Sequence, residues 1–157
     1  MKLSLTRSVI LAFALAALSG CENEKEIRAV DVEYRKNEEG KLILHEIGKE
    51  DPLSCILIQD HPNGHRRFEI RFANGIRDGN FTFWRENEIP LSKGKYRKGL
   101  RHGKFTAYGG AGELISEKTY ANGKLNGSCN FYYRYSNDEV ERFFEELEEN
   151  DLEIGEL

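Results

Sequence analysis

Four histidines and three cysteines are the residues in this sequence best suited to bind a metal or act as nucleophiles. His61 and His65 have the spacing of metal ligands on a helix, but Pro62-Asn63-Gly64 between them predicts a turn. The sequence also has no phosphate-binding loop, nucleophile elbow or cysteine-rich zinc pattern. We therefore expect a protein that is not an enzyme and has no cofactor and no metal. A hydrolase that uses a carboxylate pair stays an unsupported alternative.

Cationic and aromatic side chains interleave through the middle of the chain. Residues 64–127 hold 13 Lys and Arg against 6 Asp and Glu, a net charge of +7. This composition can suit nucleic acid, but the export signal described below argues against that partner. Tyr, Trp and Arg also dominate the energetics of protein interfaces. The candidate contact residues are Trp84, Arg85, Arg97, Arg101, Tyr108, Tyr132 and Tyr133. A plainer interpretation is that the cations solvate one face and protect sheet edges.

The N-terminal segment, positions 1–20, has the form of an export signal. Lys2 and Arg7 supply positive charge, and an unbroken apolar run follows at residues 9–18. A run of this length is too short to span a bilayer comfortably and is typical of the core of a signal peptide. We expect residues 1–20 to be removed.

The signal ends in Leu18-Ser19-Gly20-Cys21, which resembles the bacterial lipobox. The resemblance implies that Cys21 is lipidated with diacylglycerol, that the chain is cut before it, and that its new amine is acylated, for example with palmitate. Several acyl chains form a stable membrane anchor, and residues 21–30 then form a lipidated tether. Glu22 stands where aspartate is the usual inner-membrane retention signal, so the resemblance implies an outer-membrane lipoprotein facing the periplasm. The alternative is an ordinary secretory signal with a chance cysteine.

Glycines and aromatic residues recur with a 24-residue period. The columns are Gly75, Gly99 and Gly123; Gly79, Gly103 and Gly127; and Phe72, Tyr96 and Tyr120. A weaker form extends upstream through Gly64 and Gly40. Apolar and polar residues alternate between glycines that can take the positive φ of tight turns, which is typical of β-hairpins. Because one hairpin cannot bury a face by itself, we expect about four to five hairpins in one sheet.

This pattern resembles the MORN repeat, and more closely the bacterial variant found in envelope and antitoxin proteins. Tyr120-Ala121-Asn122-Gly123-Lys124-Leu125-Asn126-Gly127 is the best match, while Glu88 in a glycine column and Ala107 in an aromatic column depart from it. The resemblance implies a mainly β fold, an elongated antiparallel sheet of tandem 24-residue β-hairpin repeats over residues 31–136. It also implies a role in binding a partner. The alternative is a generic β-meander with chance glycines.

The C-terminal end of the sequence is strongly acidic. Residues 138–157 hold 10 acids and one base, a net charge of −9. Acids crowd the start of this segment, where a helix dipole favours them. One apolar stripe at helical spacing is formed by Val140, Phe143, Phe144 and Leu147. We therefore expect residues 137–157 to form a C-terminal amphipathic helix over 138–149, which caps the open end of the sheet, and an acidic tail. The alternative is an acidic recognition surface.

Two cysteines remain once Cys21 is assigned to the anchor. Cys55 and Cys129 are 74 residues apart, about three repeats. Three hairpins span on the order of 30 Å in an open sheet, whereas a disulfide needs Cα atoms within about 7 Å. We expect no bridge between them. Cys129 shares a column with Phe81 and Phe105, so the sequence predicts a buried thiol there.

Together these features predict a non-enzymatic envelope lipoprotein that works as a protein-binding repeat module. One version, which follows from the resemblance, is an immunity protein or antitoxin that neutralises a toxic secreted effector in the periplasm. The alternative is a basic, aromatic platform that binds anionic lipid or glycan in the envelope. Salt should weaken the binding of head groups by lysine and arginine more than it weakens an interface with buried aromatic residues.

Overall fold

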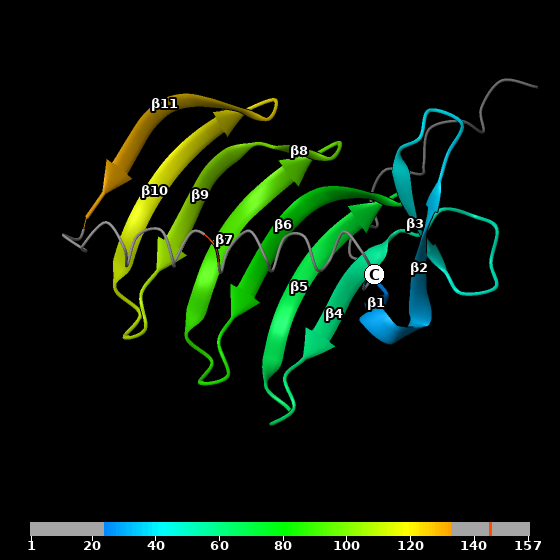
Figure 1. The fold of residues 1–157 in the computed structure, drawn as a ribbon, viewed down its shortest axis with the longest axis horizontal. Helices are drawn as coiled ribbons and strands as arrows, with labels where there is room; N and C mark the ends of the chain where they lie inside the picture. The colour runs from blue at the N-terminus through cyan, green and yellow to red at the C-terminus, as the bar shows by residue number, and fades with distance from the viewer. Residues whose placement is uncertain (1–23, 133–144, 146–157) are drawn as a thin grey trace, which may run out of the picture.

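The computed structural model describes residues 24–132 and Glu145. The expected signal peptide, Cys21, Tyr133 and the expected helix over 138–149 therefore lie outside the described residues, Glu145 excepted. The described part of the chain is mainly β, as the sequence predicts (Figure 1).

The strands follow one another with short connections. A short strand, β1 (Glu26–Arg28), leads through a 3₁₀ turn, η1 (Ala29–Asp31), into β2 (Val32–Lys36) and β3 (Leu42–Glu46). The remaining strands are β4 (Cys55–Asp60), β5 (Arg66–Ala73), β6 (Ile76–Trp84), β7 (Pro90–Arg97), β8 (Leu100–Arg101), β9 (Gly103–Tyr108), β10 (Leu114–Ala121) and β11 (Lys124–Phe131).

Nine of these strands form one sheet, in the order β1-β4-β5-β6-β7-β9-β10-β11, with β8 paired to β7. The pairs from β4 to β11 are antiparallel, but β1 pairs with β4 in parallel. The prediction of a purely antiparallel sheet is therefore wrong at this edge. A parallel pair needs a crossover connection, and β2 and β3 supply it here.

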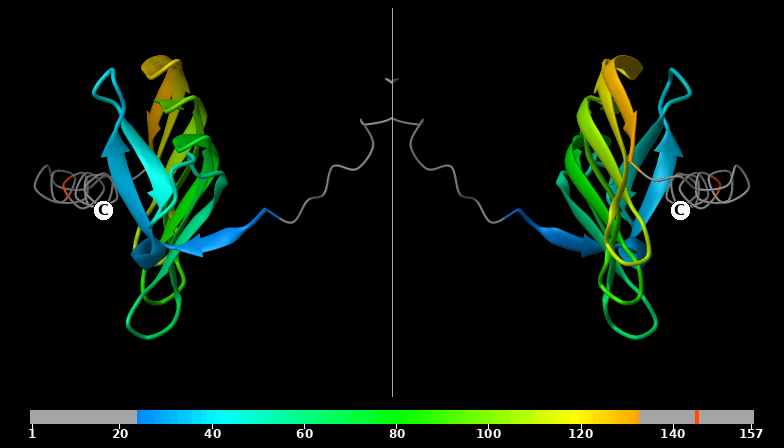
Figure 2. Two further views of the ribbon diagram at one scale, coloured as in Figure 1. Left: turned by 90° about the vertical axis from the view of Figure 1, so that its right-hand side faces the viewer. Right: turned by 90° about the vertical axis from the view of Figure 1, so that its left-hand side faces the viewer.

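The hairpin of β2 and β3 forms its own two-stranded sheet and does not extend the large one. Figure 2 shows it lying on one side of the large sheet. The expectation that residues 31–136 form hairpins of one sheet is therefore wrong for this hairpin. Its apolar side chains Val32, Ile43 and Leu44 are buried, so the hairpin contributes more by covering the sheet than by lengthening it.

One face of the large sheet carries the apolar core. Phe68 pairs with Phe83 and Ile70 pairs with Phe81, so these side chains share a face, which we call the core face. All four are buried, and Leu44 of the hairpin is 0% exposed among them. Aromatic rings continue along the core face, where the Phe81 and Phe105 centroids lie 5.3 Å apart. The opposite, largely polar side is called the outer face.

Three turns at one end of the sheet have the same conformation. Each contains two consecutive left-handed residues, as type I′ hairpin turns require; the pairs are Asn74-Gly75, Lys98-Gly99 and Asn122-Gly123. The glycine amide of each pair donates to a carbonyl oxygen of an earlier turn or strand end, over 2.7 Å (Gly75 to Leu53), 2.8 Å (Gly99 to Arg77) and 2.9 Å (Gly123 to Arg101). We call this end, at the upper right of Figure 1, the glycine end.

Gly75 is where the β2–β3 hairpin meets the large sheet. The Leu44 amide donates to the Gly75 carbonyl oxygen over 3.0 Å. A Cβ on Gly75 would lie 2.3 Å from Cγ2 of Ile43 and 2.8 Å from the Leu44 oxygen, with φ at +72°. This position therefore needs glycine both for its backbone conformation and for the close approach of the hairpin.

The turns at the other end, which we call the loop end, also share one geometry. Gly64, Glu88 and Gly112 have φ of 87°, 63° and 85°. Each donates its amide to the carbonyl of the residue three before it, His61, Arg85 or Gly109. Glu88 thus adopts the left-handed conformation of the two glycines, and the departure seen in the sequence leaves the turn intact.

Both described cysteines are free thiols, so the predicted absence of a Cys55–Cys129 bridge is confirmed. The prediction that Cys129 is buried is wrong. Cys55 is buried, but Cys129 lies on β11, where every residue is exposed. The reason is that β11 lies at the edge of the sheet, so the column that is buried on β6 is open there.

Candidate interaction surfaces

The candidate contact residues separate into two groups at opposite ends of the sheet. Arg97 and Arg101 lie at the glycine end, whereas Trp84, Arg85 and Tyr108 lie at the loop end. Tyr132 follows β11 at the loop end, since its amide donates to the carbonyl oxygen of Ile115 near the start of β10. Strand β7 alone spans eight residues between the two ends, about 26 Å. These residues therefore do not form one surface.

The glycine end combines exposed leucines with cations. Leu100 and Leu125 are 49% and 53% exposed. Leu100 pairs with Arg97 across the β7–β8 turn and lies against the turn of Gly123. The group that we call the basic-leucine cluster consists of Arg97, Lys98, Leu100, Arg101, Lys124 and Leu125, all of them exposed. It contains four cations and two large apolar side chains.

Arg101 is held in this cluster by aromatic rings of the core face. Its guanidinium carbon lies 5.5 Å from the Tyr120 ring centroid and 5.7 Å from that of Phe105. Such contacts contribute about 0.5–1 kcal/mol at exposed sites. These contacts hold Arg101 over the core face at the glycine end.

The two leucines are functional candidates that sequence reasoning missed. Leu100 comes one residue after Gly99, and Leu125 comes two residues after Gly123. A strand begins at each of these places, and an apolar residue at the start of a strand is ordinarily expected to be buried in the core. Leu125 belongs to the edge strand, so no described neighbour on its outer side can bury it. The charged residues around Gly99 and Gly123 were the only sign in the sequence that these two leucines are exposed.

The outer face carries a second group. The cross-strand partners Thr82, Lys93, Thr106, Glu117 and Asn130 form one polar line across it. Because side chains alternate along a strand, residues two positions further share the face of Thr82, Thr106 and Asn130. We call them the aromatic row: Trp84, Tyr108 and Tyr132.

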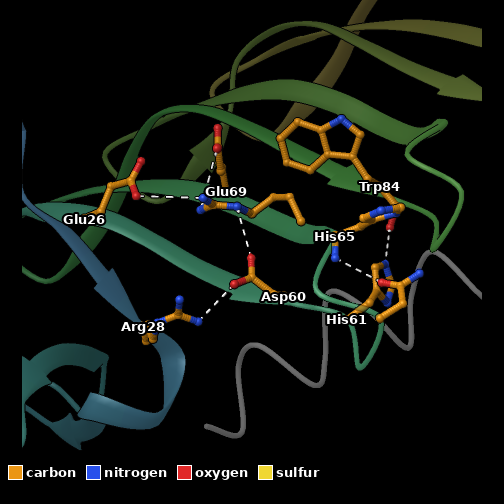
Figure 3. A network of polar contacts seen from close by, with 9 residues as sticks. Glu26, Arg28, Asp60, His61, His65, Glu69 and Trp84 are labelled. Atoms are coloured by element: carbon orange, nitrogen blue, oxygen red, sulfur yellow. Dashed lines mark hydrogen bonds and ion pairs between the residues drawn. The ribbon is translucent and has the colours of Figure 1, made fainter.

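Two contacts agree with this placement of the aromatic row. The Lys93 ammonium lies 5.7 Å from the Tyr108 ring centroid, and Asn130 Nδ2 lies 3.5 Å from the Tyr132 hydroxyl. Trp84 and Tyr108 are half-buried and Tyr132 is 53% exposed. Figure 3 shows the Trp84 indole on the side of the sheet that carries Glu69, the partner of Thr82.

A network of ion pairs lies between Trp84 and β1 (Figure 3). Asp60 accepts from Arg28 over 2.9 Å and from Arg66 over 3.2 Å. Arg66 also lies 3.8 Å from Glu26 and 3.7 Å from Glu69. These contacts join β1, β4 and β5, so they help to fasten a three-residue edge strand. The Asp60 carboxylate is fully engaged and does not stand as a free general base.

Arg85 and two histidines tie the loop-end turns together. The Arg85 Nη1 lies 3.1 Å from the carbonyl oxygen of Tyr108 and 3.2 Å from that of Gly109. His61 Nε2 lies 2.9 Å from the Trp84 oxygen, and His65 Nδ1 lies 2.8 Å from the Glu86 oxygen. A carbonyl oxygen can only accept a hydrogen bond, so the proton in each bond is on the histidine nitrogen, Nε2 in His61 and Nδ1 in His65. Arg85, a candidate contact residue, therefore positions the turn that follows Tyr108.

A hollow of about 660 Å³ opens at the loop end, lined in part by His61, Arg67, Trp84 and Arg85. Across the described residues, no group of three His, Cys, Asp or Glu side chains is arranged to hold a metal ion. Within the same residues no helix has the length and apolar character to cross a membrane. No family model, no curated protein and no solved structure matches the chain.

Proposed function

We propose that this protein is a non-enzymatic, lipid-anchored protein of the bacterial envelope that binds a protein partner through the basic-leucine cluster. The observation that carries the proposal is that two half-exposed leucines, Leu100 and Leu125, stand at the same end of the sheet as four exposed cations. An apolar centre bordered by polar and charged side chains is the usual anatomy of a protein interface. Arg is moreover enriched among the residues that dominate binding energy.

Tandem repeats are part of this proposal. The turns at Gly75, Gly99 and Gly123 share one conformation, similar inter-turn hydrogen bonds and one constant interval along the chain, which supports MORN-like hairpin repeats over the large sheet. Hydrogen bonds that link each turn to its predecessor make the glycine end rigid. A rigid surface loses little conformational entropy on binding. A C-terminal helix over 138–149 that caps the sheet belongs to the same proposal and is supported by its sequence pattern.

The lipid anchor would place the cluster away from the membrane. Cys21 lies three residues before the first described residue, and β1 forms the nearest edge of the sheet. Seven strand intervals separate β1 from β11, about 34 Å. Anchoring through Cys21 at the outer membrane therefore lets β7 to β11 reach into the periplasm.

In its most specific version, the partner is a secreted toxic effector and the protein gives immunity to it. Four cations in the cluster favour an acidic surface on the partner, because complementary charge speeds encounter. An effector that acts in the periplasm would meet the anchored protein there.

The experiment compares capture by residues 22–157 with capture by a Leu100→Asp, Leu125→Asp double variant. Each is immobilised and exposed to secreted and cell fractions of its own and neighbouring strains. Val30→Asp is the matched control, because Val30 is 76% exposed at the other end of the chain in η1. We expect one stoichiometric protein that survives high salt on the wild type and Val30→Asp, and is lost from the double variant.

Two results would overturn the proposal: no protein is retained, or the double variant retains it equally well. Thermal unfolding of both variants checks that a loss of binding is not a loss of fold. The immunity version also requires that the wild type, but not the double variant, silences the captured protein on mixing. A captured protein without toxic activity would reject that version and keep the binding function.

A further inference from the structure

We propose that the aromatic row on the outer face, Trp84, Tyr108 and Tyr132, binds a linear acidic glycan that runs across the strands. The aromatic row lies at the loop end and on the outer face, whereas the basic-leucine cluster lies at the glycine end. The two proposals therefore use different residues and can fail separately.

The spacing of the rings is the first argument. Trp84 lies on β6, Tyr108 on β9 and Tyr132 just after β11, and one strand separates each ring from the next. Adjacent rings are therefore two strand intervals apart, about 9.6 Å. This is roughly the length of one disaccharide in an extended β-linked glycan. Three rings in line can thus stack on alternate sugar rings of one chain.

The chemistry of the rings is the second argument. Tyr and Trp each combine a large apolar surface with a polar tip. The apolar C–H face of a sugar packs on such a ring, while its hydroxyl groups remain available for hydrogen bonds. Trp84 and Tyr108 stand on strands of one sheet, and the amide of Tyr132 donates to the carbonyl oxygen of Ile115 on β10. The spacing of the rings is therefore set before a ligand arrives, and little order has to be gained on binding.

A line of polar side chains lies next to the aromatic row on the outer face. Thr82, Thr106 and Asn130 lie two residues before Trp84, Tyr108 and Tyr132, on the outer face. Hydroxyl and amide groups both donate and accept hydrogen bonds, which is what sugar hydroxyls need. The aromatic row therefore runs beside a parallel line of hydrogen-bonding groups.

Lys93 indicates the charge of the ligand that this face would prefer. It pairs with Thr82 on one side and Thr106 on the other, so it stands in the polar line beside the aromatic row, and it is exposed. Its ammonium lies 5.7 Å from the Tyr108 ring centroid, next to the place where a sugar would stack. The neighbouring Lys104 is matched by Glu117 over 2.9 Å, which raises the pKa of Lys104 and neutralises both charges locally. One ammonium in the middle of the face favours a glycan with carboxylate groups over a neutral one.

The form of the aromatic row argues against a lipid surface as the ligand. Side chains that enter a membrane project as an apolar edge bordered by many cations. Here Trp84 and Tyr108 are half-buried and threonines stand beside them, so the rings do not form an apolar edge. A polar face with periodic rings suits an extended chain better than an acyl layer.

The experiment uses residues 22–157 and two defined probes, a β-1,4-linked mannuronate hexamer and the neutral cellohexaose. Trp84 is the only tryptophan of the sequence, so its fluorescence reports binding at the aromatic row directly. We expect the acidic hexamer to change Trp84 emission with saturation. Tyr108→Ala should weaken binding at least about tenfold, since it removes the central ring of the three.

Two further variants assign the roles. Lys93→Ala should remove most of the preference for the acidic over the neutral hexamer while both still change Trp84 emission. Leu100→Asp, in the basic-leucine cluster, should bind both hexamers as the wild type does. If protein capture fails but this titration succeeds, only the proposed function falls, and the reverse holds for the glycan proposal.

Three results would overturn the inference. In the first, neither hexamer changes Trp84 emission at millimolar concentration. In the second, Tyr108→Ala binds as tightly as the wild type, which would place the glycan elsewhere. In the third, Trp84 responds to vesicles of anionic phospholipid and to no glycan, which would assign the face to lipid. Circular dichroism of each variant confirms that it is folded.

Discussion

Gly94 shows how one residue without a side chain supports the aromatic core. A Cβ at this position on β7 would lie 2.6 Å from Cε1 of Phe81 and 2.9 Å from the ring of Phe105. The two rings meet over the glycine, with centroids 5.3 Å apart. Gly94 lies outside the glycine columns of the 24-residue pattern, so the sequence indicated no role for it.

Gly94→Ala should therefore lower the free energy of unfolding by about 1–3 kcal/mol, because the added methyl group forces the rings apart. Urea unfolding measures the change. Gly110→Ala is the matched control, since nothing lies within 4 Å of the Cβ it would add and no left-handed φ is recorded there. Equal stability of Gly94→Ala and the wild type would show that the rings adjust without cost.

Glu88 gives the opposite prediction. It holds a left-handed φ of 63°, in a turn where Gly64 and Gly112 take the same conformation. A side chain in this region costs on the order of 1 kcal/mol, and glycine avoids this cost. Glu88→Gly should therefore raise the unfolding free energy by about 1 kcal/mol or slightly less. Glu86→Gly in the same turn, which has no left-handed φ, should give no gain in the same urea titration.

The two cysteines of residues 22–157 should react very differently with thiol reagents. Burial raises the pKa of the Cys55 thiol to about 12, from 9.0. Cys129 is exposed on the edge strand. At pH 8 a chromogenic disulfide reagent should therefore release one equivalent quickly and the second only on unfolding. Cys129→Ser should abolish the fast equivalent, and a fast reaction that remains would contradict the burial of Cys55.

The raised pKa of Cys55 also predicts how the free energy of unfolding changes at high pH. Above about pH 9 the unfolded chain loses the Cys55 proton while the folded chain keeps it. The folded state then binds more protons, so stability falls as pH rises from about 9 toward 12. Cys55→Ser, which does not titrate in this range, should flatten this part of the pH dependence measured by thermal unfolding.

At the scale of elements, the β2–β3 hairpin buries part of the core face of the large sheet. Leu44 on β3 is fully buried, and Leu42, two residues earlier on the same strand, is 42% exposed. Leu44→Ala should cost about 2–5 kcal/mol, because it leaves a cavity between hairpin and sheet. Leu42→Ala should cost much less. Similar losses in both variants, measured by urea unfolding, would mean that the hairpin is not seated on the core.

Some elements were predictable because their signals are local. Asn-Gly pairs and paired glycines give the turns at the glycine end, and alternating aromatic residues give β5 and β6. The separate β2–β3 hairpin was not predictable, since Gly40 forms a similar turn whether or not its strands join the large sheet. Nor was β1, whose three residues carry no periodicity and whose parallel pairing depends on distant contacts.

At the scale of the whole molecule, the repeat interval explains which candidate residues come together. One interval is two strands, so residues one interval apart return to the same face and the same end. Trp84, Tyr108 and Tyr132 obey this relation, and their grouping could have been read from the sequence. Arg97 follows Trp84 by about half an interval, which carries it to the opposite end. Composition alone could not separate the two groups, because it does not take account of where a residue falls within the 24-residue interval.

The outer edge of β11 has one more consequence. Among the described residues no strand pairs with this edge, and the opposite edge of the sheet leads toward Cys21. A further hairpin paired to β11 would leave the strand pairs from β1 to β11 unchanged and carry this edge about 9.6 Å farther. The length of the sheet is in this sense set by the number of its hairpins. Gaining or losing the codons of one 24-residue interval would therefore lengthen or shorten the sheet in whole steps.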